Sequence, residues 1–381
     1  MMRIGYLHIG ETKHGIVRYG RLLAHEAKQR ADLAVIEAEL ELTGEKHRDL
    51  KQLTEVAHKL SAADVVHFQY NSQIWGGRDR QLAYLRSFFQ FCTTPRIVTL
   101  HDVYYPPSSA VLAQQYFSKS KHVSLSEFVK AVFRDRLSPN VLALHQVIER
   151  SQTVLVCTQE EARRLRDRTT SSKVKVVPHF VEARHLQIDR AEARKSLGLD
   201  GLTVITLLGF IYSGKGHQLL IEALPQLPDT VKVVFAGGAN SGQEAYYQGL
   251  MALAEKIGVS DRIRVTGYLS EQDLEQYLIA TDLAVCPFQR ASASGSLSTW
   301  ISVAQPILAS NIAQVSEYND LEPNAIQVFH PYTATALGQS IEAKISRQHD
   351  NQAISRLRQQ LAISTIFDQH LSCYEETLAT R

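Results

Sequence analysis

The stretch that decides the fold covers residues 204–310 and opens with Val204-Ile-Thr-Leu-Leu-Gly209, an apolar strand pattern. The turn Ser213-Gly-Lys-Gly216 follows and leads into an amphipathic helix pattern. A second strand pattern covers residues 231–236 and is followed directly by Gly237-Gly238. Three more strand patterns cover residues 262–267, 282–287 and 306–310. Strands that alternate with helices, with glycines at the strand ends, predict a parallel sheet that holds a phosphate-bearing ligand at its carboxyl edge.

The same alternation precedes this stretch, beginning with the apolar run Met2-Arg-Ile-Gly-Tyr-Leu-His8 and a helix pattern over 16–28. Further strand patterns cover 64–69, 96–100, 153–158 and 174–178. We therefore predict an α/β protein with two Rossmann-like, doubly wound parallel-sheet domains and a cleft between them. The predicted domains are 1–183 and 184–365, and 366–381 is a terminal helix that packs back on the first domain.

Composition narrows the class of protein. The 381 residues hold 41 Lys+Arg against 39 Asp+Glu, and a formal net charge of +2 gives no case for nucleic-acid binding. The four cysteines form no C-x-x-C pair, so we expect reduced thiols rather than disulfides or a zinc site. The first ten residues form a strand pattern instead of a signal peptide, and no apolar run reaches 18 residues. These features predict a cytoplasmic protein.

Lys215-Gly216 is the first candidate for a binding site, although the motif is short. A lysine at the mouth of a strand–loop–helix unit can place its ammonium on a diphosphate, while glycine lets the backbone amides approach. The alternative is a surface lysine in a flexible turn. Gly15 lies in the loop after the first strand, where an amide can face an anion, although a tight turn explains a glycine there equally well.

Two polar segments follow strands of the first half. His101 comes directly after the strand pattern 96–100 and suits a sugar hydroxyl or a proton-transfer role, unless it is a structural histidine paired with Asp102. The loop 69–77 contains Gln69, Asn71 and Trp75, which can bind a sugar by stacking and amide hydrogen bonds. Trp75 can instead be packing support.

A basic, partly amphipathic stretch covers residues 119–136. It is either an ordinary helix with a solvated basic face or a helix that lies on an anionic membrane at the inner face. No carboxylate-rich metal cluster, H-E-x-x-H, G-x-S-x-G or Walker loop occurs, and no G-x-G-x-x-G follows an opening strand. We therefore expect no metal and no cofactor.

These segments, taken in order, resemble the retaining nucleotide-sugar glycosyltransferases of family 4 (group 1), which have the GT-B fold. The resemblance covers most of the chain, and no single motif carries it. Its best-matched parts are Thr99-Leu-His101-Asp102, Leu208-Gly-Phe-Ile-Tyr-Ser-Gly-Lys215-Gly216, Phe235-Ala-Gly-Gly238 and Val265-Thr-Gly-Tyr-Leu269.

The resemblance implies roles for particular residues. Lys215 would bind the donor diphosphate, Gly15 would offer its amide to the same phosphates, and His101 would contact the donor sugar near the reacting carbon. The implied catalytic residues are His101 and Lys215. The implied donor-binding residues are Gly15, Lys215, Gly216, Gly238, Tyr268, Leu269, Gly295, Ser296, Leu297 and Thr299. The residues expected on the acceptor side are Gln69, Asn71, Trp75 and Tyr104.

Two departures from the family pattern bear on activity. The usual arginine five residues before the lysine is replaced by Phe210. The usual Glu-x7-Glu carboxylates fall on Ala291 and Thr299, and each lost charge-assisted hydrogen bond is worth ~1.5–3 kcal/mol unless it is replaced. Ser296 and neighbouring hydroxyls offer replacements, and the chain looks closer to a branch of the family that has Ser-Gly-small-Leu in this place.

The expected protein is thus a metal-independent glycosyltransferase of the hexosyltransferase type. It would move a sugar from a nucleoside diphosphate sugar to a glycan or lipid-linked acceptor with retention, which is an implication of the family alone. The alternative is a catalytically silent GT-B protein, a sugar-nucleotide-binding or scaffold partner in a glycan assembly complex. A sugar-nucleotide epimerase of the same fold is a second alternative.

Overall fold

Two six-stranded parallel sheets form the cores of two separate units in the computed structural model of this chain. The structure describes residues 1–11, 14–101, 103, 107–118, 124–166, 168–169, 172–184, 186–240, 242–291, 293–346 and 351–380. Unit 1 consists of Met1–His179 together with Ile363–Arg381, and unit 2 consists of Phe180–Ala362. The sequence places the corresponding junctions at 183/184 and 365/366.

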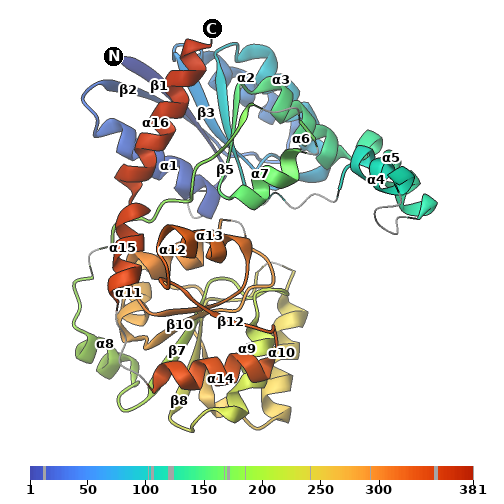
Figure 1. Cartoon of the computed structure of the whole chain (residues 1–381). Coiled ribbons are helices and arrows are strands. Elements are labelled where there is room, and N and C mark those ends of the chain that lie inside the picture. The colour runs from blue at the N-terminus through green and yellow to red at the C-terminus, as the bar shows by residue number, and fades with distance from the viewer. Residues whose placement is uncertain are drawn as a thin grey trace. The chain divides into compact units, whose positions relative to one another are not determined.

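Unit 1 has the sheet order β2-β1-β3-β4-β5-β6 (Figure 1). Its strands are β1 (Met2–Ile9), β2 (Leu33–Leu40), β3 (Val65–Tyr70), β4 (Arg96–Leu100), β5 (Thr153–Val156) and β6 (Val174–Val176). Its helices are α1 (Gly15–Lys28), α2 (Lys46–Leu60), α3 (Gly77–Phe91), α4 (Ser109–Ser118), α5 (Leu125–Leu137), α6 (Pro139–Arg150), α7 (Gln159–Arg166) and α16 (Ile363–Ala379). The strand order reverses between β1 and β3, which is where doubly wound folds hold their ligands.

Unit 2 has the sheet order β12-β11-β10-β7-β8-β9. Its strands are β7 (Thr203–Leu208), β8 (Val231–Ala236), β9 (Ile263–Val265), β10 (Leu283–Cys286), β11 (Ile307–Ser310) and β12 (Gln327–Phe329). Its α-helices are α8 (Arg190–Leu197), α9 (His217–Ala223), α10 (Glu244–Lys256), α11 (Glu271–Ala280), α12 (Gly295–Ser302), α13 (Ala313–Leu321), α14 (Ala334–Ile345) and α15 (Gln352–Gln360), with short 3₁₀ turns at Leu224–Gln226 and Ser260–Arg262. Here the order reverses between β7 and β10.

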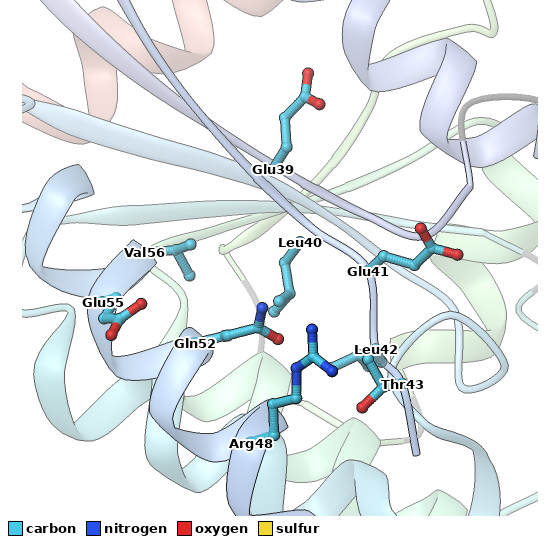
Figure 2. A pocket seen from close by; sticks show the side chains of 9 residues that line it. All are labelled: Glu39, Leu40, Glu41, Leu42, Thr43, Arg48, Gln52, Glu55 and Val56. Carbon is cyan, nitrogen blue, oxygen red and sulfur yellow. The ribbon is translucent and has the colours of Figure 1, made fainter. Parts of the chain in front are cut away.

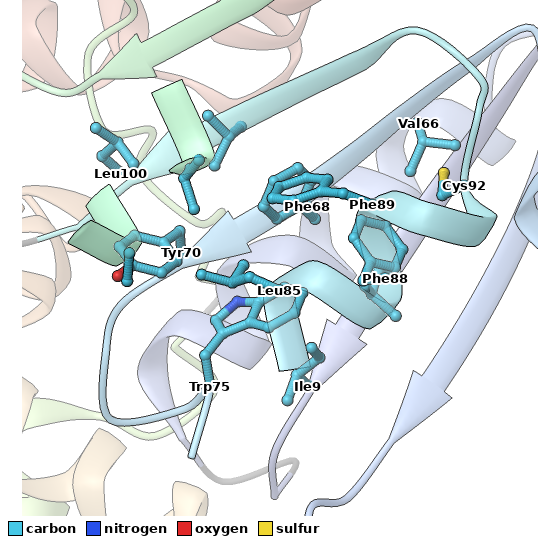
Figure 3. Packing of buried hydrophobic residues seen from close by; sticks show 14 of the residues in the cluster. Ile9, Val66, Phe68, Tyr70, Trp75, Leu85, Phe88, Phe89, Cys92 and Leu100 are labelled. Atoms are coloured by element: carbon cyan, nitrogen blue, oxygen red, sulfur yellow. The ribbon is translucent and has the colours of Figure 1, made fainter. Parts of the chain in front are cut away.

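The apolar strands form because helices cover both faces of each sheet. All six residues of β3 are buried, and alternate side chains point to opposite faces. Figure 3 shows Phe68 of β3 among Trp75, Phe88 and Phe89, with the Phe68 and Phe88 ring centroids 5.6 Å apart in an edge-to-face arrangement. This aromatic cluster fixes α3 against one face of the unit 1 sheet.

Helix α16 covers part of the opposite face of the same sheet. Its Phe367 and Tyr374 are completely buried, and its Thr377 Oγ1 lies 2.7 Å from Thr153 Oγ1 of β5. The last segment of the chain therefore completes the core of unit 1, although the whole of unit 2 separates it from β6 in the sequence.

The predicted fold class is confirmed. The strand patterns at 96–100 and 231–236 match β4 and β8 residue for residue, whereas β2 and β12 were not predicted. Both lie at a sheet edge, and β2 carries Glu37 and Glu39 among its apolar residues, which removes the continuous apolar run of a central strand. Helix α16 begins at Ile363, three residues before the predicted start.

Candidate functional site

Lys215 lies at the carboxyl edge of the unit 2 sheet, in the loop between β7 and α9. Only 6% of its surface is exposed, and its Nζ donates to Ser296 Oγ at 2.7 Å. Gly209, directly after β7, has φ 103°, and a Cβ there would lie 2.8 Å from Ser296 Oγ and 3.1 Å from Lys215 Nζ. The glycine at the strand end therefore leaves the space that the lysine and serine side chains occupy.

The ammonium of Lys215 is nearly buried beside two aromatic rings and has no ion pair among the described residues. Its Nζ lies 4.5 Å from the ring centroid of Phe288 and 5.9 Å from that of Tyr212. Burial lowers the pKa of Lys215 from 10.5 to about 8. At neutral pH the Lys215 ammonium carries a positive charge that water solvates incompletely. The electrostatic contribution to the binding of an anionic ligand is therefore larger here than at an exposed lysine.

Gly216 fixes the loop after β7 against the loop after β10. It has φ 94°, and a Cβ there would lie 2.1 Å from the carbonyl oxygen of Pro287. The amide of Gln289 donates to the carbonyl oxygen of Gly214 at 2.9 Å. The two loops on either side of the β7/β10 strand-order reversal are thus in direct backbone contact, which places Lys215 at that crevice.

Helix α12 presents its N-terminus beside Lys215. Ser294 is the N-cap, and its Oγ accepts from the amide of Leu297 at 3.2 Å. The Leu297 amide is therefore occupied, and the amides of Gly295 and Ser296 are the ones left at the start of the helix. Thr299 Oγ1 donates to the carbonyl oxygen of Gly295 at 2.8 Å, so its hydroxyl offers a ligand only an acceptor oxygen.

The remaining predicted donor-binding residues lie in the loops after β8 and β9. A Cβ on Gly238 would lie 3.5 Å from the Cα of Gly267, so these loops pack backbone against backbone. Tyr268 follows and is 74% exposed, whereas Leu269 is partly buried and packs on the apolar cluster under α8. The structure therefore brings Gly238 and Tyr268 to the same sheet edge as Lys215.

His101 follows β4 in unit 1 and is buried. Its Nε2 lies 2.8 Å from Gln69 Oε1 of β3, and the Tyr19 ring packs edge-on at 5.2 Å between centroids. Burial lowers the pKa of His101 to about 3, with smaller contributions from His179 and His14. The imidazole is therefore neutral at physiological pH, which removes a role as a resident acid. Asp102, the sequence-level alternative partner, lies outside the described residues.

The loop after β3 does not present its polar residues as a sugar-stacking platform. Trp75 is completely buried, and its Nε1 donates to the carbonyl oxygen of Gln69 at 2.9 Å, so it is the packing support that the sequence left as its alternative. Gln69 is only 5% exposed. Asn71 Oδ1 accepts from the amide of Gln73 at 2.9 Å and shapes the turn. Tyr104 lies outside the described residues.

Gly15 is the first residue of α1, and a Cβ there would meet nothing within 4 Å. A side chain at this exposed position would therefore meet no neighbour among the described residues. Three residues were not predicted as site residues: Tyr212 and Phe288, whose rings face Lys215, and Ser294, the N-cap of α12. A serine before Gly-Ser-Leu is an N-cap signal that sequence analysis can detect, whereas the two rings meet the lysine only through the tertiary fold.

A separate pocket of about 340 Å³ lies at the carboxyl end of β2 and the start of α2. Figure 2 shows its labelled residues, with the guanidinium of Arg48 between Gln52 and the chain that carries Thr43. Gln52 Oε1 is buried and has no hydrogen-bond partner among the described residues. The lining mixes carboxylates with one guanidinium, which suits a polar ligand with hydroxyl groups.

No group of three or more histidine, cysteine, aspartate or glutamate side chains is arranged to hold a metal ion within the described ranges. Among the helices described, none combines the length and the apolar character that crossing a bilayer requires.

The two doubly wound units define the GT-B fold, and solved structures of that fold align along the chain. Anabaena HepE in complex with UDP and glucose aligns with a TM-score of 0.71 at 16% identity, covering 99% of this chain and 100% of that one. Sucrose-phosphate synthase from Thermosynechococcus elongatus aligns with a TM-score of 0.68 at 16% identity, covering both chains completely. At such identities the likeness establishes the fold.

Sequence comparison gives the second line of evidence. Residues 189–360 match the family model of the glycosyl transferases group 1, in agreement with the resemblance that the motifs indicate. D-inositol 3-phosphate glycosyltransferases of Mycobacterium sp. (strain KMS) and Mycobacterium leprae (strain Br4923) are 30% and 28% identical over 242 and 243 residues. Each alignment covers 61% of this chain, and the chain spans about half the length of these curated relatives.

Proposed function

We propose that this protein is a glycosyltransferase that moves a sugar from a nucleoside diphosphate sugar to a glycan or lipid-linked acceptor. The observation that carries the proposal is the environment of Lys215. A nearly buried ammonium without a carboxylate partner among the described residues lies at a strand-order reversal, beside the free amides of a helix N-terminus. A diphosphate supplies the missing negative charge and accepts hydrogen bonds from both.

The fold neighbours suggest the first donors to test. HepE structures contain UDP, UDP with glucose, and UDP-glucose, and these ligands are properties of that protein. For this chain we propose a nucleoside diphosphate donor with Tyr268 beside the base, because its exposed ring follows β9 at the same sheet edge as Lys215. UDP and UDP-glucose are the first probes, followed by GDP, ADP and dTDP and their sugar conjugates.

The proposed reaction breaks the bond between the anomeric carbon and the leaving phosphate and forms a bond to the acceptor oxygen. Lys215 and the amides of Gly295 and Ser296 stabilise the charge that develops on the diphosphate. The acceptor hydroxyl attacks from the same face, and its proton passes to the leaving phosphate oxygen. Retention and independence from metal are parts of the proposal that derive from the family resemblance.

The replaced motif residues shape how the donor is held. Phe210, in place of the arginine, is about half exposed and provides no charge. Thr299 provides one acceptor oxygen for a ribose hydroxyl, and Ala291 provides no polar group. We propose that Ser296 and the start of α12 take over the polar contacts to the donor, with Lys215 as the cation for the diphosphate.

We place the acceptor on unit 1, where the pocket at β2 and α2 offers mixed charge. Arg48 and Gln52 can bind oxygen atoms and hydroxyl groups of a polar acceptor there. Arg48→Ala should raise the KM for the acceptor and leave the affinity for the nucleotide unchanged. A variant with unchanged acceptor KM excludes this pocket.

A membrane contact is proposed for the outer face of α5. The apolar stripe Leu125, Val129, Phe133 and Leu137 is exposed along this helix, with Lys130 and Arg136 exposed beside it. Figure 1 shows α4 and α5 packed on each other at the edge of unit 1. An apolar stripe flanked by cations suits an anionic lipid surface.

Co-sedimentation with vesicles tests the membrane contact. A larger fraction of the wild-type protein should sediment with phosphatidylglycerol vesicles than with phosphatidylcholine vesicles. The substitution Phe133→Ser should reduce the fraction that sediments with phosphatidylglycerol vesicles. Val328→Ser, at an exposed residue of unit 2, is the control. Equal retention of Phe133→Ser and wild type contradicts the assignment.

The variant His101→Ala distinguishes an active enzyme from a catalytically silent scaffold. For an enzyme, transfer of labelled sugar from the donor should collapse while nucleotide affinity, measured by calorimetry, stays near the wild-type value. Nucleotide binding without transfer or donor hydrolysis in the wild-type protein supports the scaffold. Conversion of the donor to its epimer without an acceptor supports the epimerase.

A further inference from the structure

A chain of buried polar side chains runs from His101 along one face of the unit 1 sheet to the C-terminal helix. His67 and Gln69 are two residues apart on β3, so they point to the same face, toward α1 and α16. Gln69 Nε2 lies 3.5 Å from His67 Nε2, and His67 Nδ1 lies 2.8 Å from the hydroxyl of Tyr374 in α16. The Tyr374 hydroxyl lies 3.1 Å from that of Tyr6 in β1.

Every member of this chain is uncharged at neutral pH. Burial holds the pKa of His67 well below its usual range, and the pKa of His101 is about 3. Burial raises the pKa values of Tyr374 and Tyr6 far above neutrality. At neutral pH these side chains therefore have no net charge, and they influence one another through the direction of their hydrogen bonds.

A side-chain amide sets that direction because it has an acceptor on one side and a donor on the other. Gln69 Oε1 faces His101 at 2.8 Å, so His101 Nε2 carries the proton and donates. The NH₂ group faces His67 Nε2, which is then unprotonated and also accepts from Thr99 Oγ1 at 2.8 Å. The His67 proton is consequently on Nδ1 and is donated to Tyr374.

Packing holds the Gln69 side chain in place. A Cβ on Gly20 of α1 would lie 3.2 Å from Gln69 Cγ, so α1 approaches this side chain as closely as a glycine permits. Trp75 Nε1 donates to the Gln69 carbonyl oxygen and fixes the backbone from the other side. With its stem and backbone held in this way, the amide turns only about its last bond, and the hydrogen-bonding needs of His101 and His67 decide which of them meets its oxygen and which meets its NH₂ group.

We propose that Gln69 is a positioning residue that fixes His101 as its Nε2–H tautomer, so that His101 offers Nδ1 as a hydrogen-bond acceptor to a sugar hydroxyl. His67 and Tyr374 support the orientation of the amide from behind. The sugar contact rests on the proposed function, whereas the tautomer assignment does not. Toward the sugar, His101 thus accepts a hydrogen bond at Nδ1 and does not donate a proton. Gln69 acts through His101 and does not itself contact the sugar.

The wild-type protein tests the tautomers directly. Long-range ¹H–¹⁵N NMR of histidine-labelled protein distinguishes protonated from unprotonated ring nitrogens, and His101→Asn and His67→Asn each remove one set of signals for assignment. The expected result is a protonated Nε2 in His101 and a protonated Nδ1 in His67. A protonated Nδ1 in His101 together with a protonated Nε2 in His67, or the same tautomer in both residues, overturns the proposal. This result needs no substitution at Gln69.

Two substitutions at Gln69 separate positioning from packing. Gln69→Glu keeps an acceptor oxygen toward His101 and should preserve the Nε2–H signature. Gln69→Leu removes the acceptor and should give a mixture of His101 tautomers. Gln81→Leu is the matched control, because Gln81 is a buried glutamine of unit 1 whose amide bonds to Tyr70 and Asn140. A Gln81→Leu effect on His101 equal to that of Gln69→Leu contradicts a specific role.

Calorimetry with UDP and UDP-glucose tests the sugar contact. Gln69→Leu should reduce the affinity advantage of UDP-glucose over UDP about fivefold, the effect of one neutral hydrogen bond, and leave UDP affinity unchanged. An unchanged advantage overturns the sugar contact. If neither nucleotide binds the wild-type protein, the proposed donor site fails, and the NMR result still decides the tautomers.

Discussion

Replacing Lys215 by methionine should stabilise the free protein and weaken its binding of a nucleoside diphosphate. Methionine keeps the apolar stem between Phe288 and Tyr212 and removes the charge. The Lys215 ammonium is nearly buried and has no carboxylate partner among the residues described, so the folded protein bears its desolvation cost when no ligand is bound. The same charge is what a diphosphate requires.

Both magnitudes follow from the structure. Lowering the pKa from 10.5 to about 8 corresponds to about 3 kcal/mol of unfavourable free energy for the buried cation. The free energy of unfolding of Lys215→Met at pH 7 should therefore rise by up to about 3 kcal/mol. Losing a charge-assisted hydrogen bond of ~1.5–3 kcal/mol should weaken UDP binding about 10- to 150-fold.

Thermal unfolding with and without UDP measures both effects in one experiment. The variant should melt several degrees above wild type without ligand and show a smaller rise on adding UDP, because ligand stabilisation follows RT ln(1 + [L]/Kd). Lys256→Met, at an exposed lysine of α10, is the control and should change neither quantity. A Lys215→Met protein that is less stable than wild type and binds UDP equally well would refute this account of the site.

Three further outcomes are expected. UDP affinity measured by calorimetry should be constant between about pH 7 and 8, where the terminal phosphate of UDP is ionised, and fall above it, because free Lys215 then loses the proton that the diphosphate favours; constant affinity up to pH 10 contradicts a role for this ammonium. Gly209→Ala should weaken UDP binding more than Gly242→Ala, since both have positive φ but only Gly209 places a Cβ against Ser296 and Lys215; equal losses point to backbone strain alone. Ser294→Ala should lower the free energy of unfolding by about 1 kcal/mol in denaturant titrations through loss of the α12 cap, and an unchanged value shows that the cap does not stabilise the helix.

The strands and the position of Lys215 were predictable because both depend on local sequence. A strand covered on both faces is mostly apolar. β10 is a continuous apolar run, β8 has one lysine among its apolar residues, and β3 is apolar apart from His67 and Gln69. Lys215 follows such a run and precedes a helix, so its place at the carboxyl edge follows from topology alone. The edge strand β2 escaped prediction because its outer positions hold Glu37 and Glu39.

The surroundings of these residues depend on contacts between segments far apart in the chain. Nothing in the sequence near Lys215 indicates that Phe288 and Ser296 will enclose it, 73 and 81 residues later. Likewise, Tyr374 reaches His67 only because α16 packs on the face of the unit 1 sheet that carries alternate residues of β3. Local pattern determines which side chains reach a sheet edge, whereas burial, pKa and hydrogen-bond direction arise from whatever the packed chain brings against them.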